Sequence, residues 1–237
     1  MVTKKITSLQ HPLVKHWVEL RENRSYREEA QRVLVSGEKM ARELRPKVLI
    51  SLEATSIVAE DHYLVTEAIL KKITGLEHPD GFAAEIALPP PQDLTSKKYL
   101  VILDQIADPG NLGTLLRTAL ALQWEGVIVT PGTVDLFNDK ALRAAKGATF
   151  RLPYARLTTD EIAQLKVHFF TADLEGKALP NAQFKPPMAL ILSHEGRGPG
   201  SWSSTIAQKI TIPMGEEVES LNVASSGAIL LYAMRSK

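Results

Sequence analysis

The chain has 237 residues, enough for one large or two modest domains, and its composition is 44% hydrophobic and 23% charged, as in a typical globular protein. No apolar run is long enough to cross a bilayer, and the first residues lack the apolar core of a signal peptide. The absence of cysteine excludes disulfides, thiolate metal sites and cysteine nucleophiles. These features together predict a cytoplasmic location.

Charge is distributed unevenly along the chain. The net charge is only +1, but residues 1–47 hold eleven Lys and Arg against six Glu, with His11 and His16 in addition. Such an excess favours a surface that faces a polyanion. A solvated amphipathic helix is the alternative interpretation.

The first part of the chain is expected to form a small α/β domain over residues 1–88. Apolar spacing predicts a helix over 6–22 with Ser8 as its cap, and another helix from a Thr66 cap to Ile73. The other expected elements are strands over 33–37, 48–52, 56–59 and 82–88, a helix over 38–44, and turns over 21–27 and 78–81. Residues 89–97 include three consecutive prolines and are expected to form a stiff linker.

The second domain, residues 98–237, is expected to alternate between strand and helix. The expected strands are 99–104, 126–130, 168–173, 188–193 and 209–213, and the expected helices are 111–122, 138–146, 158–165, 203–208 and 223–234. Near-continuous apolar strands that alternate with helices predict a mostly parallel sheet covered by helices on both faces. Ligands of such sheets bind beyond the carboxyl ends of the strands, so the polar loops there are the candidate sites.

The first candidate segment, 104–119, contains a turn at Asp108-Pro-Gly110, and Asn111 and Arg117 come after this turn. With Asn111 as a helix cap, both side chains can reach the loop end of the sheet. An Arg in an otherwise apolar helix is expected to have a partner, because an unpaired buried guanidinium is costly. An Asn cap with an Arg that extends into solvent is the alternative.

The second candidate loop is Ser193-His-Glu-Gly-Arg-Gly-Pro-Gly200, whose glycines permit a ligand to approach the backbone closely. A dinucleotide-binding interpretation fails, because the third glycine of that fingerprint falls on Ser201 and too little chain follows. His194 has no second ligand at metal spacing, so no metal site is expected.

The third candidate loop, 212–222, places Ser220 and Asn222 before a helix that starts with small residues, Ala224-Ser-Ser-Gly-Ala228. A helix N-cap is one interpretation of these two polar residues. The small side chains at the start of the helix leave room for either a packed neighbour or a ligand.

In order and spacing, the three loops resemble the motifs of the SpoU/TrmH family of RNA ribose 2′-O-methyltransferases, of the SPOUT class. The resemblance covers nearly the whole chain. The segments that carry it in the second domain are Asn111-Leu-Gly-Thr-Leu-Leu-Arg117, Lys140–Gly147, Glu195-Gly-Arg-Gly198 and Ile212-Pro-Met…Ser220-Leu-Asn222. The segments similar to the family's RNA-binding domain are Ile6–Lys15, Val35–Lys39 and Pro79–Gly81.

The resemblance implies a C-terminal SPOUT α/β-knot domain, in which the polypeptide forms a trefoil knot, and a small N-terminal α/β RNA-binding domain of ribosomal-protein-like fold. It implies methyl transfer from S-adenosylmethionine to a ribose 2′-hydroxyl of structured RNA. The separate N-terminal domain favours rRNA over tRNA. The family also implies a homodimer whose active site is completed across the subunit interface.

The resemblance further implies the site residues by motif position. The catalytic residues would be Arg117, Asn111, Glu195, Ser220 and Asn222. The cofactor-binding residues would be Thr171, Ala172, Ser193, Glu195, Gly196, Ile212, Met214 and Leu221. The residues expected to contact RNA are Lys15, Arg24, Arg27, Lys39 and Arg143.

Arg117 is expected to bind the neighbouring phosphate and to stabilise the forming alkoxide, with Ser220 or Asn222 orienting it. The guanidinium stays protonated in proteins, which disfavours the general-base role proposed for this arginine in the family.

Two residues depart from the family pattern. Ser193 stands where glycine is usual, which narrows the expected cofactor pocket, and Ala233 replaces an acidic residue common near the end of the last helix. Two alternative functions are a non-catalytic RNA-binding ribosome-assembly factor and, more distantly, an oxidoreductase that binds through the Gly-rich loop. Binding of S-adenosylmethionine distinguishes the methyltransferase from the non-catalytic RNA-binding protein, and absence of NAD binding excludes the oxidoreductase.

Overall fold

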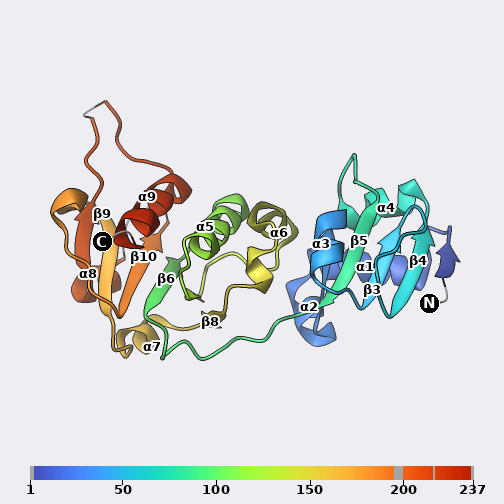
Figure 1. Ribbon diagram of the computed structural model, residues 1–237, viewed down its shortest axis with the longest axis horizontal. Helices are drawn as coiled ribbons and strands as arrows, with labels where there is room; N and C mark the ends of the chain where they lie inside the picture. The colour runs from blue at the N-terminus through green and yellow to red at the C-terminus, as the bar shows by residue number, and fades with distance from the viewer. Residues whose placement is uncertain (1–2, 195–199, 216, 236–237) are drawn as a thin grey trace. The chain divides into compact units, whose positions relative to one another are not determined.

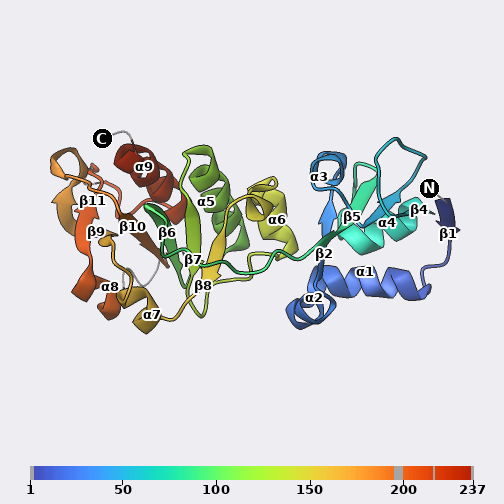
Figure 2. The same cartoon turned by 60° about the horizontal axis from the view of Figure 1, so that its bottom comes forward.

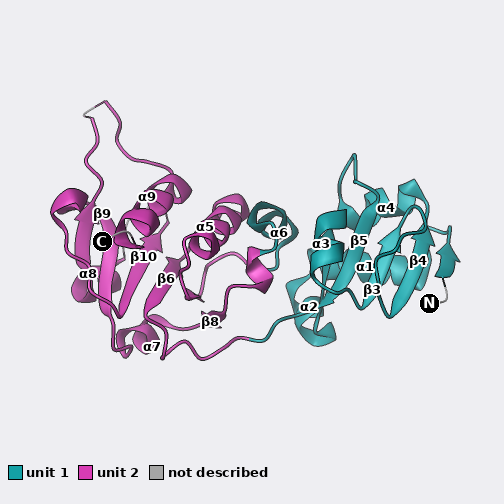
Figure 3. Ribbon diagram, in the orientation of Figure 1, with its two compact units in different colours: residues 1–90, 137–147 teal, residues 91–136, 148–237 magenta. Residues whose placement is uncertain are grey.

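The computed structural model describes residues 3–194, 200–215 and 217–235 of the chain (Figure 1). The chain divides into two compact units, residues 1–90 with 137–147 and residues 91–136 with 148–237 (Figure 3). The division after Pro90 falls within the expected linker, whereas segment 137–147 groups with the first unit rather than the second. Among the described residues no helix is both long and apolar enough to span a membrane.

Unit 1 contains a five-stranded mixed sheet with the strand order β1-β4-β3-β5-β2. Strand β4 pairs in parallel with β1 and β3, whereas β5 pairs antiparallel with β3 and β2. The strands are β1 (Thr3–Ile6), β2 (Arg32–Ser36), β3 (Val48–Ser51), β4 (Asp61–Val65) and β5 (Phe82–Ala87). The helices are α1 (Pro12–Glu22), α2 (Arg24–Ala30), α3 (Glu38–Glu43), α4 (Glu67–Thr74) and α6 (Asp139–Ala145).

Helices α1 and α4 supply much of the unit 1 core. Their apolar residues recur at three- and four-residue spacing, so they form one stripe that packs against the sheet. The completely buried members are Val14, Trp17 and Leu20 of α1 and Ile69, Leu70 and Ile73 of α4. Thr66 caps α4 as expected, because its side chain accepts a hydrogen bond from the Ile69 N–H.

The structure of unit 1 differs from the sequence-based expectations at four elements. Helix α1 begins at Pro12, not at residue 6, because Pro12 occupies the first turn and the His11 side chain caps the helix in place of Ser8. The strand expected at 56–59 is not formed there, and Val58 is 83% exposed. Strand β4 lies instead at Asp61–Val65. Strand β1 was missed, and helix α2 was expected to be a turn.

Unit 2 contains a six-stranded sheet with the order β11-β9-β10-β6-β7-β8, in which every neighbouring pair is parallel. The strands are β6 (Tyr99–Asp104), β7 (Gly126–Val129), β8 (Tyr154–Arg156), β9 (His168–Ala178), β10 (Met188–Ser193) and β11 (Gln208–Thr211). The helices are α5 (Pro109–Ala121), α7 (Thr159–Ala163), α8 (Ser201–Ile206) and α9 (Val223–Arg235), with short 3-10 helices at Ala148–Phe150 and Leu179–Asn181. The expected parallel α/β sheet is confirmed, although β8 was missed and β9 extends past residue 173.

The unit 2 sheet is covered on both faces, as Figure 2 shows. Helices α5 and α9 lie side by side on one face, and α7 and α8 lie on the other. The direction of strand addition reverses between β6 and β10, because β7 and β8 lie on one side of β6 and the later strands on the other. Ligands of open parallel sheets bind at such a switch point.

Candidate functional site

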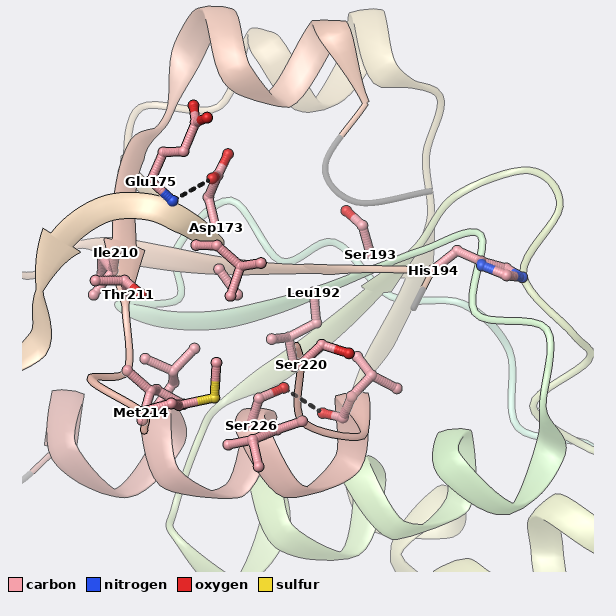
Figure 4. Close-up of a pocket in the computed structure, with 16 residues that line it drawn as sticks. Asp173, Glu175, Leu192, Ser193, His194, Ile210, Thr211, Met214, Ser220 and Ser226 are labelled. Carbon is pink, nitrogen blue, oxygen red and sulfur yellow. Dashed lines mark hydrogen bonds between the residues drawn. The ribbon is translucent and has the colours of Figure 1, made fainter. Parts of the chain in front are cut away.

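A cavity of ≈ 360 Å³ opens at the carboxyl ends of β10 and β11, beside residues 172–175 in the middle of β9 and the start of α9 (Figure 4). Its apolar walls can accept a flat ring, and its hydroxyl groups can orient one. The apolar lining residues are Ala172, Leu174, Leu192, Ile210, Ile212, Met214, Leu221, Val223 and Leu230. The polar lining residues are Asp173, Glu175, Ser193, His194, Thr211, Ser220 and Ser226.

Charged groups gather where β9 and β11 meet the cavity. Lys209 Nζ lies 2.8 Å from an Asp173 carboxylate oxygen and 3.9 Å from one of Glu175. Burial raises the pKa of Asp173, but the hydrogen bonds from Lys209 and the Glu175 N–H outweigh burial, so the pKa lies below its usual value. The bond to Asp173 in turn raises the pKa of Lys209. Two carboxylates against one ammonium leave this edge of the cavity negative.

Asn222 connects two loops that are 111 residues apart in the sequence. Its side-chain Nδ2 donates a hydrogen bond to Asn111 Oδ1 at 3.2 Å. Its Oδ1 accepts from the Ala224 N–H at 2.9 Å, which caps α9. Asn111 was expected to cap α5, but Asp108 is the cap. The Asp108 side chain accepts a hydrogen bond from the Asn111 N–H.

The small residues at the start of α9 serve both a packed neighbour and the cavity. A side chain on Gly227 would come within 2.4 Å of Leu115 on α5 and 2.9 Å of Leu192 on β10. Gly227 therefore permits α9 to approach α5 and the sheet closely. Ser226, the preceding residue, lines the cavity instead, and its hydroxyl donates to the Val223 carbonyl oxygen at 3.3 Å (Figure 4).

Residues 98–232 match the model of the SpoU rRNA Methylase family. The chain belongs to this family. It is 31% identical to the 23S rRNA (guanosine(2553)-2′-O)-methyltransferase RlmP of Bacillus subtilis, over 98% of this chain and 99% of the relative.

Solved structures of other methyltransferases have the same fold. An AdoMet-bound rRNA methyltransferase from Sinorhizobium meliloti superposes with a TM-score of 0.86 at 24% identity, over 99% of this chain and 98% of that chain. The SpoU methyltransferase AviRb from Streptomyces viridochromogenes superposes with a TM-score of 0.81 at 23% identity, over 95% and 97% of the two chains. Nearly the whole length of this chain, and not only the residues of the family model, therefore has counterparts in fold.

The structure brings most of the expected SpoU family cofactor residues to one cavity. The expected residues that line it are Ala172, Ser193, Ile212, Met214 and Leu221, with Ser220 from the expected catalytic set. Thr171 is 1% exposed on β9 and is not a lining residue. Glu195 and Gly196 lie outside the described residues.

The expected SpoU family catalytic residues are only partly assembled within this one chain. Asn111 and Asn222 are hydrogen-bonded, and Ser220 lies at the cavity. Arg117 lies two turns into α5 and is exposed, and the part of the chain that the structure describes contains no buried partner for it. The exposed guanidinium remains available to a ligand or to another molecule.

The basic residues expected to bind RNA differ in their exposure. Lys15, Arg24 and Lys39 are exposed, whereas Arg143 is half-buried and paired with Asp139. Arg27 does not fit the prediction, because it is only 3% exposed. Its guanidinium donates to the carbonyl oxygens of residues 20 and 21 at the end of α1, so it joins α2 to α1.

Several cavity residues were missed at the sequence level. Asp173 ends the strand 168–173 expected from the sequence and Glu175 follows it, so the rule that ligands bind beyond strand ends could have found them. Leu192, Val223, Ser226 and Leu230 belong to a strand and a helix that were both predicted, but no sequence signal shows which of their faces borders the cavity.

Proposed function

We propose that this protein transfers a methyl group from S-adenosylmethionine to a ribose 2′-hydroxyl of rRNA. The observation that carries the proposal is the cavity at the carboxyl edge of the parallel sheet, where Ser193 and His194, which precede the second family motif, meet residues of the third motif. The membership in the SpoU rRNA Methylase family supports it, as does the similarity to a 23S rRNA 2′-O-methyltransferase along the full chain. A structural neighbour is AdoMet-bound.

The lining of the cavity fits the chemistry of S-adenosylmethionine. Ile212, Met214 and Leu221 offer apolar surface for an adenine ring, and the hydroxyls of Ser193 and Ser226 can bond to polar atoms. The negative edge at Asp173 and Glu175 suits a ligand that carries a sulfonium and an ammonium group. When bound, the cofactor supplies an electrophilic methyl group.

The chain's own residues supply positioning and electrostatic stabilisation. Arg117, which is exposed and permanently protonated, binds the phosphate next to the target ribose and stabilises the alkoxide. The Asn111–Asn222 hydrogen bond holds the ends of the first and third motifs together, so that Ser220 lies where the ribose approaches. Alignment of the reacting oxygen is a major source of rate acceleration in such transfers.

Calorimetry with S-adenosylmethionine and a methyl-transfer assay on rRNA from a strain that lacks the gene test this function. Binding and methylation of one ribose are expected. Absence of binding at millimolar cofactor contradicts the enzymatic function and favours a non-catalytic RNA-binding assembly factor. Methylation of tRNA, but not of rRNA, contradicts the substrate assignment alone.

The pH–rate profile of Arg117→Lys tests the role of the arginine. If Arg117 is an electrostatic group, the substitution lowers the rate and leaves the apparent base pKa unchanged. A large shift of that pKa contradicts this role and indicates a proton acceptor.

The proposed enzyme has an N-terminal RNA-binding domain and a trefoil-knotted C-terminal domain. The excess of basic residues in 1–47 supports RNA binding by unit 1. Hydrogen bonds from Trp124 to the Leu231 carbonyl and from Arg235 to the Leu122 carbonyl hold α9 against the end of α5, and this return of the last helix to the first helix of unit 2 supports the knot. Tracing the path of the chain in a crystal structure tests the knot.

The proposed enzyme is a homodimer. Ile229 and Tyr232 of α9 are 41% and 63% exposed, and such apolar exposure on one helix suits a subunit interface. Tyr232→Glu is expected to convert the dimer to a monomer in size-exclusion chromatography with light scattering. A monomeric wild type contradicts the proposal.

A further inference from the structure

Asp104 is a buried carboxylate at the end of β6, outside the residues that line the cavity. It is 2% exposed and lies directly opposite Ser193 in the parallel pairing of β6 with β10. It therefore lies at the switch point of the sheet, where β6 of one half pairs with β10 of the other half. A carboxylate at this depth requires hydrogen-bond donors, because burial of an unsatisfied charge is costly.

The two oxygens of Asp104 have different partners. Oδ1 accepts from the Thr130 hydroxyl at 2.8 Å, and this hydroxyl also accepts from the Gln105 N–H at 3.1 Å, so this oxygen is bound to the β7 side of the sheet. Oδ2 accepts from the Trp202 indole N–H at 3.1 Å and, at the longer distance of 3.5 Å, from the Ser193 hydroxyl.

The partners of Oδ2 stand on either side of segment 195–199 in the sequence. Ser193 ends β10 and lines the cavity, and Trp202 lies in the first turn of α8. Gly200 permits this proximity, because a side chain there would come within 3.0 Å of the Trp202 ring. One carboxylate thus connects both flanks of the second family motif to the central strand.

We propose that Asp104 is a positioning residue that acts through Oδ2, holding Ser193 and Trp202 in the geometry that the cavity needs to bind S-adenosylmethionine. The inference rests on the proposed function for the identity of the ligand. Asp104 acts on binding through these two residues and not by contact with the ligand. The bond from Thr130 to Oδ1 only anchors the carboxylate to the sheet.

The test uses the full chain and isothermal calorimetry with S-adenosylmethionine, at a temperature well below the unfolding of every variant. In Asp104→Asn the side-chain amide keeps one acceptor for Thr130 and turns N–H donors toward the Trp202 N–H. The dissociation constant is expected to rise at least tenfold, about the effect of losing one charge-assisted hydrogen bond. In the transfer assay the KM for the cofactor rises, and the KM for RNA does not.

Three further variants separate positioning from general loss of structure. Trp202→Phe removes the donor to Oδ2 and is expected to weaken cofactor binding by roughly threefold to tenfold. In the double variant Asp104→Asn/Trp202→Phe, the indole N–H that would face the new amide N–H is absent. The dissociation constant of the double variant is therefore expected to lie below that of Asp104→Asn alone. Thr130→Val, the matched control at Oδ1, is expected to lower the unfolding temperature and leave cofactor affinity within about twofold.

The outcomes separate the inference from the function on which it rests. Wild-type affinity in both Asp104→Asn and Trp202→Phe overturns the inference and leaves the proposed function intact. Equal loss of affinity in Thr130→Val and Trp202→Phe also overturns it, because the effect is then not specific to Oδ2. If Asp104→Asn does not fold, the comparison of Trp202→Phe with Thr130→Val decides. Absence of binding by the wild type overturns the function and the inference together.

Discussion

At the scale of single residues, the site depends on side chains that make two bonds at once. Asn222 uses its oxygen to cap α9 and its nitrogen to hold Asn111. Because the cap fixes the orientation of the Asn222 amide, the nitrogen is directed at the first motif. The stability of the helix and the geometry of the site are therefore coupled in one residue.

Variants of the asparagine pair are expected to separate these two contributions. Asn222→Ala loses both bonds, so it should lower the free energy of unfolding by about 1 kcal/mol and the rate of methyl transfer by roughly tenfold. Asn111→Ala keeps the cap, so it should lower the rate of methyl transfer without lowering the free energy of unfolding. Asn111→Asp keeps an acceptor for the Asn222 side-chain nitrogen. Denaturant unfolding and single-turnover transfer at saturating cofactor measure the two effects. Full activity in Asn111→Ala contradicts a role for this bond.

His62 makes the stability of unit 1 dependent on pH. It is 1% exposed, its Nε2 lies 2.7 Å from the Ser51 hydroxyl oxygen, and burial lowers its pKa below the ordinary value of 6.5. The unfolded chain therefore takes up a proton near pH 6.5 that the folded protein resists, so stability is lost as the pH falls below that value.

The slope of this loss is expected to approach about 1.4 kcal/mol per pH unit until the folded pKa is reached. His62→Gln should remove most of the dependence, and His78→Gln, at an exposed histidine, should not. Urea unfolding between pH 5 and pH 8 measures the difference. Parallel curves for the wild type and His62→Gln would show that another group causes the dependence.

At the scale of elements, one edge of the cavity depends on the close approach of β9 to β11. The register of this pair shifts between Lys209 and Ile210. A side chain on Gly176 of β9 would come within 2.5 Å of the Ile210 backbone nitrogen. Because the obstacle is backbone, it cannot move aside as a side chain can. Glycine is therefore required at the point where Lys209 turns toward Asp173.

Gly176→Ala is expected to destabilise the protein by about 2 kcal/mol and to weaken cofactor binding, because the two strands must separate. Gly215→Ala is the matched control in the loop after β11, where an added side chain would meet none of the described residues within 4 Å. The control should change stability by no more than about 0.5 kcal/mol. Thermal unfolding and cofactor titration of both variants test this, and equal behaviour of the two contradicts it.

At the scale of the whole molecule, the two units are expected to divide the work between RNA and cofactor. Exposed basic residues are concentrated in unit 1, whereas the cavity lies in unit 2. Phosphate contacts dominate the affinity of proteins for nucleic acids and make it dependent on salt. Substitution in unit 1 should therefore change RNA affinity without a change in cofactor affinity.

Lys15→Glu is expected to weaken RNA binding and to reduce the dependence of log affinity on log salt concentration by roughly 0.7 to 0.9 for the lost phosphate contact. Lys185→Glu makes the same change in net charge at an exposed residue of unit 2 and should have a smaller effect. Filter binding of rRNA fragments over a series of salt concentrations measures both, with calorimetry to verify unchanged cofactor affinity. Equal losses in the two variants would indicate a general effect of net charge.

Much of this protein could be predicted without a structure, because the signals are local. The apolar runs of β6, β7 and β10 and the spacing in α4, α5 and α9 predict their elements from side-chain burial alone. The motif residues were also recognisable, and those at Ser193, Ile212, Met214 and Leu221 do line one cavity. Strand 61–65 was missed because its polar residues weaken the apolar signal that β6 displays.

Only the tertiary structure decided which distant residues lie together. The Asn111–Asn222 bond and the attachment of Ser193 and Trp202 to Asp104 join residues about 90 to 110 positions apart, and no local pattern encodes such distances. The same holds for Arg27. Its charge predicted an exposed side chain, but in the structure it is buried against the end of α1. Local sequence determines how a segment can fold, but burial and proximity arise from the packing of distant segments.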